Sequence, residues 1–409
     1  MKNIARLLFS MTVILVLIMN KTVFAQDWTQ WRGANGDGKV TGFDAPQAWP
    51  GNLPVKWKVT VGLGDASPVI TGDKLFTFTR QGNDEVIRCV GLATGEEVWQ
   101  YKYPALAISG PASSQHPGPR GTPAVGAGRI VTLGVGGVLT CLDLAKGALL
   151  WSNEDFTKDL PPFFTGLSPL IFDGMCIVHM GGKEKGEVIA FDMKSGKQKW
   201  ICPCDAPSYA SPLIMQVKGK KQIVVLTAKN LVGIDPAKGK LLWQFAVPTE
   251  NRFYNAASPV INEETVIITG QGQGTKAVKI EKKGDGYVAG ELWKNNELGT
   301  KWNTPVLKDG FLYGVSDGRK LFCMNAATGK TAWIDTRLHN DFGSIVDAGS
   351  LIIALPQTSN LVVFKPDQTS YSEVALIKVA DTPTYSYPIL AGNKLVIKDK
   401  ESLAMMTVK

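Results

Sequence analysis

Residues that most often carry catalysis or bind metals are scarce in this sequence. It has only three histidines, His116, His179 and His339, and no two of them have the spacing of metal ligands. None of its six cysteines is adjacent to another, and the Cys-x-x-Cys-His signature of haem attachment is absent. No Ser/His/Asp or Cys/His arrangement can be argued from the residue order. We therefore predict no metal site and no catalytic residue.

Long apolar runs are also missing beyond the first residues. The one candidate, Leu7 to Met19, follows Lys2 and Arg6 and precedes the small-residue cleavage signal Val23-Phe24-Ala25. It is too short to span a bilayer, so the pattern indicates a signal peptide over residues 1–25. No cysteine near the cleavage point indicates a lipoprotein anchor. We expect an exported protein, periplasmic or extracellular, with no transmembrane segment in the mature chain.

The chain has no block of like charges. Its formal net charge of +8 falls to +5 when Lys2, Arg6 and Lys21 leave with the signal peptide, which holds no acid. A mildly basic chain without a Lys/Arg cluster gives little support to nucleic-acid binding. We expect no nucleic-acid partner.

What the sequence does contain is a short phrase that recurs along its length. A polar turn with Gly is followed four residues later by Trp in five copies, with a variant from Gly290 to Trp293. Gly supplies the left-handed backbone of a hairpin loop, and Trp lies in the strand that leaves it. A phrase that recurs every ~40 to 50 residues is the signature of a propeller or solenoid. Counted with Trp57, which is in phase, the structural tryptophans of the repeat are Trp57, Trp99, Trp151, Trp200, Trp243, Trp293 and Trp333.

A second phrase, Ser or Thr followed by Pro, marks the start of each unit, because Pro is tolerated at the first residue of a strand. Its six copies are Ser67-Pro68, Thr122-Pro123, Ser168-Pro169, Ser211-Pro212, Ser258-Pro259 and Thr304-Pro305. Two more apolar runs lie between the two phrases, so each unit holds four strands. Four-stranded units in radial repetition are the blades of a β-propeller.

The number of blades follows from the two ends of the repeat. A seventh unit opens at Gly343 and keeps the strand pattern without the Gly and Trp, and an eighth opens at Tyr387-Pro388 but is one strand short. The run from Val55 to Val59 supplies the missing strand. We predict an all-β fold: a lead-in over residues 26–50, then an eight-bladed propeller of four-stranded antiparallel blades over 51–409, whose last blade is closed by the N-terminal strand.

The cysteines fit this register better than they fit disulfides. Cys89, Cys141 and Cys323 occupy equivalent places in the third strands of their blades, which predicts small buried apolar residues. Cys202 and Cys204 form the one close pair, but a Cys-Pro-Cys spacing is awkward for a bridge. Their disulfide status stays open.

The laid-out repeats resemble those of the pyrroloquinoline-quinone-type (PQQ-like) propellers. The likeness rests on the blade ending Asp-x-x-x-Gly-x-x-x-Trp, as in Asp143 to Trp151, Asp192 to Trp200 and Asp235 to Trp243. The lead-in Trp28-Thr29-Gln30-Trp31-Arg32-Gly33 and the stretch from Gly118 to Pro123 resemble a BamB-like envelope subgroup of that family.

The resemblance implies two alternative functions. In quinoprotein dehydrogenases of this fold, PQQ stacks on a Trp beside two adjacent cysteines, Ca²⁺ is held by acidic and amide side chains, and an Asp is the base. That reading would make Trp302 or another aromatic residue of the mouth the stacking platform, and Asp65 or Asp317 the base, of an alcohol or sugar oxidoreductase. In assembly-factor propellers the ring is a scaffold whose loops bind partners. This sequence has no adjacent cysteine pair. The resemblance therefore favours a scaffold without a cofactor, whose expected binding partner is an envelope protein or polymer.

Residues just before each Ser/Thr-Pro should gather at one mouth of the central channel. In order they are Asp65, Arg120, Thr165, Tyr209, Asn255, Trp302, Phe342 and Tyr385. Aromatic faces with a few polar groups suit a flat or extended ligand, so the candidate ligand-binding residues are Arg120, Tyr209, Asn255, Trp302 and Tyr385. Two readings stay open for Arg120: it forks onto a carboxylate of a ligand, or it bonds backbone carbonyls of its own loop.

Three long loops, residues 104–119, 153–166 and 247–256, belong to the same type of connection and should therefore decorate one face. Phe163, Phe164, Phe253 and Tyr254 in these loops are candidate partner-binding residues, because clustered aromatics mark partner surfaces. The alternative is that they fold over the blades as ordinary packing. We expect the propeller itself to be a monomer.

Overall fold

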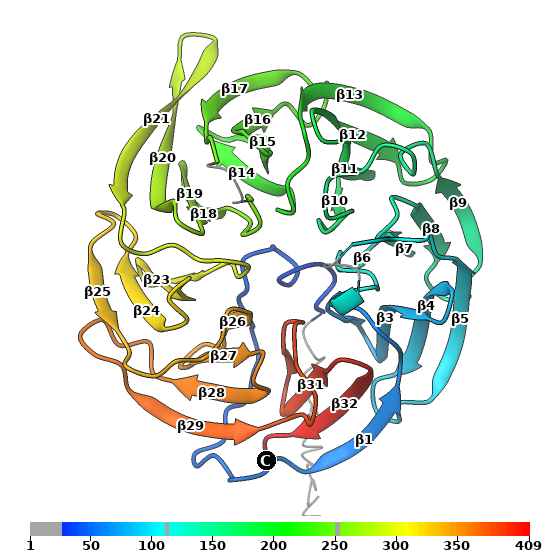
Figure 1. Ribbon diagram of the computed structural model, residues 1–409, viewed down its shortest axis with the longest axis vertical. Helices are drawn as coiled ribbons and strands as arrows, with labels where there is room; N and C mark the ends of the chain where they lie inside the picture. Colours follow the sequence, from blue (N-terminus) through cyan, green and yellow to red (C-terminus); the bar gives the residue numbers. More distant parts are fainter. Residues whose placement is uncertain (1–26, 111–113, 250–253) are drawn as a thin grey trace, which may run out of the picture.

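The computed structural model describes residues 27–110, 114–249 and 254–409. Within them, eight four-stranded antiparallel sheets stand around a central axis (Figure 1). This arrangement confirms the eight-bladed propeller that the repeats predict. No helix among these residues is long and apolar enough to cross a membrane. The expected signal peptide and Phe253 lie outside the described residues.

Seven blades use four consecutive strands, with the first strand nearest the axis and the fourth at the rim (Figure 1). The first three blades are β2 (Val69–Thr71), β3 (Lys74–Gln81), β4 (Asp84–Gly91) and β5 (Glu97–Pro104); β6 (Ala124–Gly126), β7 (Arg129–Leu133), β8 (Leu139–Asp143) and β9 (Leu149–Asn153); and β10 (Leu170–Phe172), β11 (Met175–Gly181), β12 (Lys185–Asp192) and β13 (Gln198–Asp205). The next two are β14 (Leu213–Val217), β15 (Lys220–Leu226), β16 (Asn230–Ile234) and β17 (Leu241–Ala246); and β18 (Val260–Asn262), β19 (Thr265–Gly270), β20 (Gly274–Lys283) and β21 (Gly286–Asn295). The sixth and seventh are β22 (Val306–Lys308), β23 (Phe311–Val315), β24 (Leu321–Asn325) and β25 (Thr331–Ile334); and β26 (Gly343–Asp347), β27 (Ile352–Pro356), β28 (Asn360–Phe364) and β29 (Glu373–Lys378).

The eighth blade joins the two ends of the chain, as predicted. It consists of β30 (Ile389–Ala391), β31 (Lys394–Lys398), β32 (Ser402–Thr407) and, at its rim, β1 (Val55–Thr60). β1 pairs antiparallel with β32, with Val59 opposite Leu403. Because the first strand completes the last sheet, the ring closes without an unpaired edge inside it.

The repeated Trp and Gly meet across blade boundaries. The turn glycines have the expected left-handed backbone, as in Gly147 with φ +68°, and a Cβ there would lie only 2.4 Å from Cε3 of Trp99 in the preceding blade. The indole Nε1 of Trp99 also donates to the backbone carbonyl of Leu144, at 3.1 Å. Trp57, Trp151, Trp200, Trp293 and Trp333 make the same kind of bond into the next blade, at 2.8–3.1 Å. The repeated Trp therefore links six of the eight blades to the next blade.

Trp243 departs from this pattern. Its Nε1 donates to Oε1 of Gln222 in its own blade, at 2.6 Å, and its ring packs against Gly233 of the same blade. Where other blades make the tight glycine turn, β20 and β21 continue as a longer hairpin that projects from the ring (Figure 1). The next blade thus offers Trp243 no glycine turn to pack on.

The Ser/Thr-Pro phrases form a second link, close to the axis. The hydroxyl of each Ser or Thr accepts a hydrogen bond from the backbone N–H of the matching residue in the preceding blade, at 2.8–3.2 Å. Ser67 does the same for the N–H of Tyr387, at 2.9 Å, across the closure of the ring. These bonds hold the starts of the blades that they join at one level, and so fix the backbone of the mouth residues that precede them.

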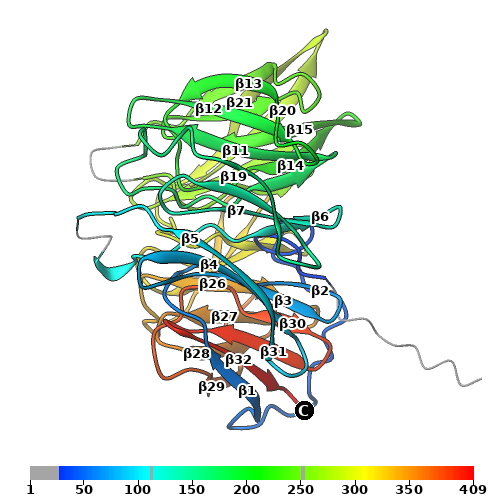
Figure 2. The same cartoon turned by 90° about the vertical axis from the view of Figure 1, so that its right-hand side faces the viewer.

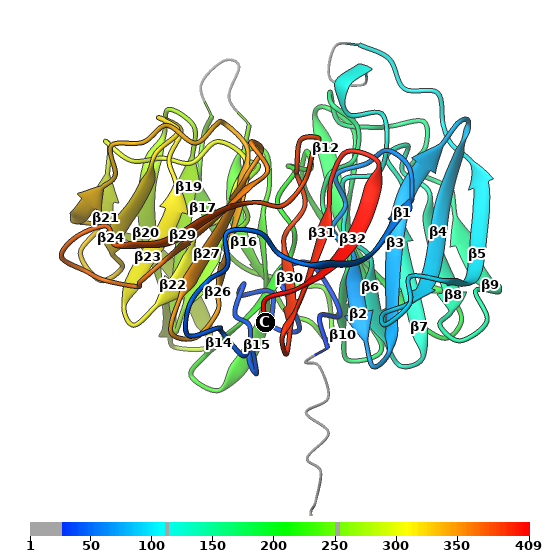
Figure 3. The same cartoon turned by 90° about the horizontal axis from the view of Figure 1, so that it is seen from below.

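The lead-in crosses the channel on the face opposite the long loops (Figures 1 and 3). It pairs with the first blade through Trp28 and Ile70, and its Val40 N–H donates to the Asp347 carbonyl of the seventh blade at 2.8 Å. Arg32, only 1% exposed, donates from Nη2 to the carbonyls of Pro305 (2.7 Å) and Asp37 (3.1 Å). In the edge-on view of Figure 2, the part of this segment that crosses the channel lies on the right-hand side of the ring, where it closes one end.

Candidate functional site

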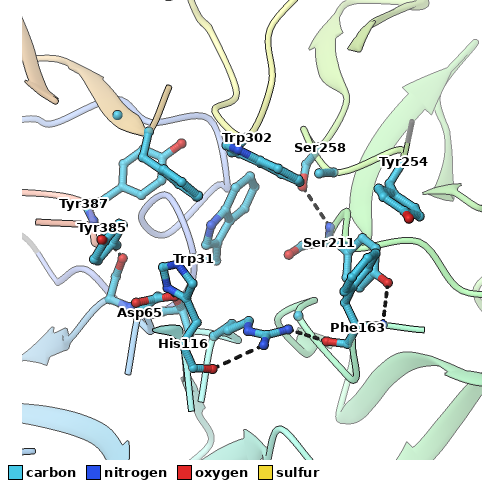
Figure 4. Close-up of a pocket in the computed structure, with 18 of the residues that line it drawn as sticks. Trp31, Asp65, His116, Phe163, Ser211, Tyr254, Ser258, Trp302, Tyr385 and Tyr387 are labelled. Atoms are coloured by element: carbon cyan, nitrogen blue, oxygen red, sulfur yellow. Dashed lines mark hydrogen bonds and ion pairs between the residues drawn. The ribbon is translucent and has the colours of Figure 1, made fainter. Parts of the chain in front are cut away.

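A cavity of about 450 Å³ lies at the mouth of the channel, on the face that carries the long loops (Figure 4). Its wall is largely aromatic, and the lead-in supplies its floor. The aromatic residues that line it are Trp31, Phe163, Tyr209, Tyr254, Trp302, Phe342, Tyr385 and Tyr387. The register argument thus placed Tyr209, Trp302, Phe342 and Tyr385 correctly at one mouth.

The aromatic side chains form two groups on opposite sides of the cavity (Figure 4). On one side Trp302 stacks on Phe342, with centroids 5.6 Å apart and an interplanar angle of 11°, and Phe342 meets Tyr385 edge to face at 5.3 Å. On the other side Phe163 meets Tyr254 edge to face at 4.8 Å. Such contacts hold the rings in fixed orientations, so the wall is formed before any ligand arrives.

Trp31 of the lead-in forms the floor. Its ring meets that of Tyr387 edge to face, with centroids 5.9 Å apart, and the guanidinium carbon of Arg32 lies 5.4 Å from its centroid. Sequence reasoning assigned no site role to the lead-in, since a segment outside the repeat has no register from which to place it. The floor makes the cavity a blind pocket with its opening on the loop-bearing face.

Arg120 holds two of the long loops together. Its Nη1 donates to the carbonyl of Phe163, and its Nη2 donates to the carbonyl of His116 at 3.2 Å. Burial lowers the pKa of this guanidinium from its ordinary value, and the nearby Asp65 opposes that shift. Of the two readings left open by the sequence, the structure supports the bonding of backbone carbonyls, from its own loop and from the next.

Asp65 and His116 form a polar pair in the wall. The Asp65 Oδ2 and His116 Nδ1 are 2.7 Å apart, and the two side chains are 22% and 14% exposed. The ammonium of Lys398 is buried behind Asp65 and donates to the Gly64 carbonyl; burial lowers its pKa to about 8, against the pull of Asp65. Sequence reasoning missed His116. The available signal was its place four residues before Arg120, in the loop that reaches the same mouth.

Asn255 was predicted at the mouth, and that placement is wrong. Its side chain is 3% exposed and does not line the cavity; its Nδ2 donates to the carbonyls of Thr227 (2.9 Å) and Ala228 (3.2 Å). Thr165 is buried in the same way and donates to the Gly134 carbonyl at 2.5 Å. Both side chains hold their loops in place through these hydrogen bonds to backbone carbonyls. Asp317, one of the two candidate bases, also lies outside the cavity and accepts the Gly272 N–H at 3.1 Å.

Two of the candidate partner-binding residues line the cavity, and a third lies outside it. Phe163 and Tyr254 are half-buried and line the cavity, whereas Phe164 is half-buried outside it with a left-handed backbone, φ +66°. Tyr209 steadies the first of these, because its hydroxyl accepts the Phe163 N–H at 3.1 Å. The loops are therefore partly packed and still present aromatic surface to the opening.

All six cysteines are free thiols. Cys89, Cys141 and Cys323 are fully buried in third strands, as predicted. Cys202 and Cys204 do not form a bridge, and the Sγ of Cys204 lies 3.3 Å from Nε2 of His179. Burial raises the pKa of the Cys204 thiol to about 12. This pair is therefore a neutral contact within the third blade rather than a reactive thiolate.

His179 predicts an acid-sensitive step in stability. It is 1% exposed on β11, and burial lowers its pKa from 6.5 to about 4. Between these values the unfolded chain binds a proton that the folded chain does not, so His179 destabilises the fold progressively as the pH falls through this window. The loss approaches about 3 kcal/mol at the lower end. Chemical denaturation at pH values above, within and below the window should show a smaller acid loss in His179→Gln; an unchanged pH profile would assign the loss to other groups.

Comparison with known proteins places this fold in a recognised group. Residues 83–335 match the family model described as outer membrane protein assembly factor BamB. The BamB of Burkholderia pseudomallei is 25% identical over 362 residues, which cover 83% of this chain and 84% of that protein.

Solved structures show the same fold at lower identity. The structure of BamB from Moraxella catarrhalis superposes with a TM-score of 0.65 at 14% identity, covering 87% of this chain and 98% of that one. The quinohemoprotein alcohol dehydrogenase of Comamonas testosteroni gives a TM-score of 0.71 at 12% identity, covering 94% and 80%. Since proteins with and without redox chemistry share this ring, structural likeness alone does not assign a function. The family model matches more than half of the sequence, and the chain belongs to the PQQ-like β-propeller family that the BamB model describes.

Proposed function

We propose that this protein is an exported binding and assembly scaffold of the bacterial cell envelope, whose loop-bearing face engages an envelope protein or polymer. The observation that carries the proposal is the blind aromatic pocket on that face, with Phe163 and Tyr254 at its wall and Phe164 beside it. Clustered aromatic side chains in a concave surface are typical of binding sites. The similarity to outer membrane assembly factors supports the same conclusion.

The described parts of the three loops are bonded to one another before binding. Arg120 joins the loop at His116 to the loop at Phe163, and the N–H of Tyr209 donates to the Asn255 carbonyl of the third loop at 3.0 Å. Groups that are already held by such bonds lose little conformational entropy when a partner binds. This favours a specific partner over weak, adaptable adhesion.

The quinoprotein alternative requires PQQ and Ca²⁺ at the same mouth, and the donor set does not suit them. Trp302 is a stacking platform, but Ca²⁺ takes about six to eight oxygen ligands, and Asp65, paired with His116, is the one carboxylate that lines the cavity among the described residues. These residues hold no group of three His, Cys, Asp or Glu side chains able to bind a metal. The charge of Arg120 is opposed by the nearby Asp65 and that of Lys301 by Asp341, so neither is an uncompensated cation for the carboxylates of PQQ. The chemistry of the lining thus supports binding without this cofactor.

Site-specific crosslinking in intact cells tests the scaffold proposal. A photoreactive residue at position 164 or 254 should crosslink a discrete envelope partner, and Phe163→Ala should reduce the yield about tenfold, as the loss of a binding hot spot does. Position 292 is the matched control, since Leu292 is 55% exposed on β21 at the rim, away from the loops. Crosslinks no stronger at the loops than at position 292 would overturn the proposal.

A further inference from the structure

The charges around the cavity favour a neutral ligand. Asp65 and Arg120 both line it and have opposite formal charges, and the buried ammonium of Lys398 near Asp65 is also balanced by Asp399 and Glu401. The ammonium of Lys301, beside Trp302, is paired with Asp341 at 3.0 Å. A strongly anionic or cationic ligand would therefore meet no uncompensated counter-charge, and desolvating it in an apolar pocket is unfavourable. A ligand without net charge avoids that penalty.

The polar groups that remain are a mixture of donors and acceptors. Asp65 Oδ1 and His116 Nε2 have no hydrogen-bond partner in the part of the chain that the structure describes. Two of the five N–H groups of Arg120 are engaged in the carbonyl bonds, and the Gln115 amide lies exposed at the wall. A hydroxyl group both donates and accepts, so it can pair with any of these. The lining thus suits several hydroxyl groups on one ligand.

The apolar surfaces of the cavity suit a ligand with flat or ring-shaped faces. Trp302 is 38% exposed, the most exposed aromatic residue of the wall, and it is braced by its stacking on Phe342. The Phe163 and Tyr254 pair faces it across the opening (Figure 4). Rings with apolar C–H faces and hydroxyl groups at their edges match both walls and polar groups. Sugar rings have this combination.

The shape of the cavity defines how such a ligand would enter. The floor of Trp31 and Tyr387 blocks passage through the channel, so a polymer cannot thread the ring. The volume of about 450 Å³ lies in the range of small-ligand sites, about 300–1,000 Å³. A short oligosaccharide or the end of a longer chain would fit, whereas the middle of a polymer would not.

From this lining we infer that the cavity binds the terminal rings of a neutral saccharide, with Trp302 as the stacking platform and Asp65, His116 and Arg120 as hydrogen-bonding groups. The inference rests on the proposed function, because it names the class of envelope ligand that the loop-bearing face takes. Asp65 also acts as a positioning residue. Its bond to Nδ1 of His116 favours the tautomer that leaves Nε2 as an acceptor toward a sugar hydroxyl.

Calorimetric titration of the mature protein with a small panel tests the inference. The neutral probes are cellotriose, maltotriose, mannotriose and N-acetylated chitotriose. The charged probes are the deacetylated chitotriose, which is cationic, and a galacturonic acid trimer, which is anionic. At least one neutral trimer should bind more tightly than both charged trimers. Trp302→Ala should weaken that binding about tenfold or more, as loss of a ring-stacking contact does. Asp65→Asn should weaken it too, whereas Leu292→Ala at the rim should bind like the wild type.

The same experiment separates this inference from the proposed function. No binding of any neutral trimer at millimolar concentration, or tighter binding of a charged trimer, would overturn the saccharide inference. Binding that is unchanged in both Trp302→Ala and Asp65→Asn would also overturn it, because the ligand would then lie elsewhere. Thermal melting of each variant confirms that it is folded. Crosslinking at Phe164, which lies outside the cavity, reports on the partner surface independently. A crosslink at position 164 that is no stronger than at position 292 would overturn the scaffold proposal.

Binding of the end of a saccharide chain, rather than its middle, can be tested separately. The bound fraction of the protein on insoluble chitin, cellulose, mannan or starch, whichever matches the trimer that binds, should rise when partial hydrolysis multiplies the chain ends. Retention that is indifferent to the number of ends would contradict entry by chain termini. A ligand that is a free oligosaccharide rather than a polymer end would bind in solution and compete with this retention.

Discussion

Replacing Trp200 with alanine should lower the free energy of unfolding by about 3–5 kcal/mol, the usual loss for a large aromatic residue in a core. Trp200 is 7% exposed, and its indole packs so closely on Gly239 of the next blade that a Cβ there would lie 2.6 Å from Cε3. Its Nε1 donates to the Pro236 carbonyl at 3.0 Å. The substitution removes both contacts and leaves a void between the third and fourth blades. In a repeat protein each unit depends on such nearest-neighbour contacts.

Chemical denaturation followed by circular dichroism measures this loss. Leu292→Ala is the control, because Leu292 is 55% exposed at the rim and a surface truncation usually changes stability by about 0.5 kcal/mol or less. Trp200→Phe should fall between the two, since it keeps an apolar ring but loses the hydrogen bond. If Trp200→Ala were as stable as Leu292→Ala, the Trp–Gly contact would not be what joins these blades.

The fold was predictable because its defining signals are local. The left-handed turn at Gly147 and the Trp that follows it are set by residues a few positions apart, and they repeat in phase. The contact that these residues make is not local: Trp99 packs on Gly147, forty-eight positions later. Nothing in one repeat shows whether its Trp packs on its own blade or on the next. For that reason the different packing of Trp243 appears only in the structure.

The candidate site was only partly predictable. Strand register determines where the backbone of a mouth residue lies, and it brought Asp65, Arg120, Trp302 and Tyr385 to one cavity. Register does not determine the direction of a side chain in a loop, and Asn255 turns inward because the carbonyls of Thr227 and Ala228 accept its N–H groups.

The remaining parts of the cavity come from segments outside the repeat. His116 reaches the wall from an irregular loop, and Trp31 reaches the floor from the lead-in. Both depend on contacts between residues far apart in the sequence, such as the bond from Arg32 to the Pro305 carbonyl. A sequence pattern with one period contains no information about segments that do not share it.

Substituting Arg32 by methionine should therefore affect both stability and the site. Methionine keeps much of the side-chain volume but leaves the Pro305 and Asp37 carbonyls without their charged donor, and such bonds contribute about 1.5–3 kcal/mol each. Burial lowers the pKa of Arg32, which shows that desolvating its guanidinium opposes part of that gain. The expected net loss is about 2–4 kcal/mol. Because Arg32 also packs on Trp31, the floor of the cavity should loosen with it.

Three measurements together test this role of Arg32. Denaturation gives the stability, limited proteolysis reports whether residues 27–50 detach from the ring, and titration with the neutral trimer reports on the floor at Trp31. Lys39→Met is the matched control, since Lys39 lies in the same segment with an exposed side chain. Arg32→Met should be cleaved faster in the lead-in and bind the saccharide more weakly, while Lys39→Met behaves like the wild type. A protected lead-in and wild-type stability in Arg32→Met would mean that the backbone bonds of Trp28 and Val40 are sufficient to close the channel.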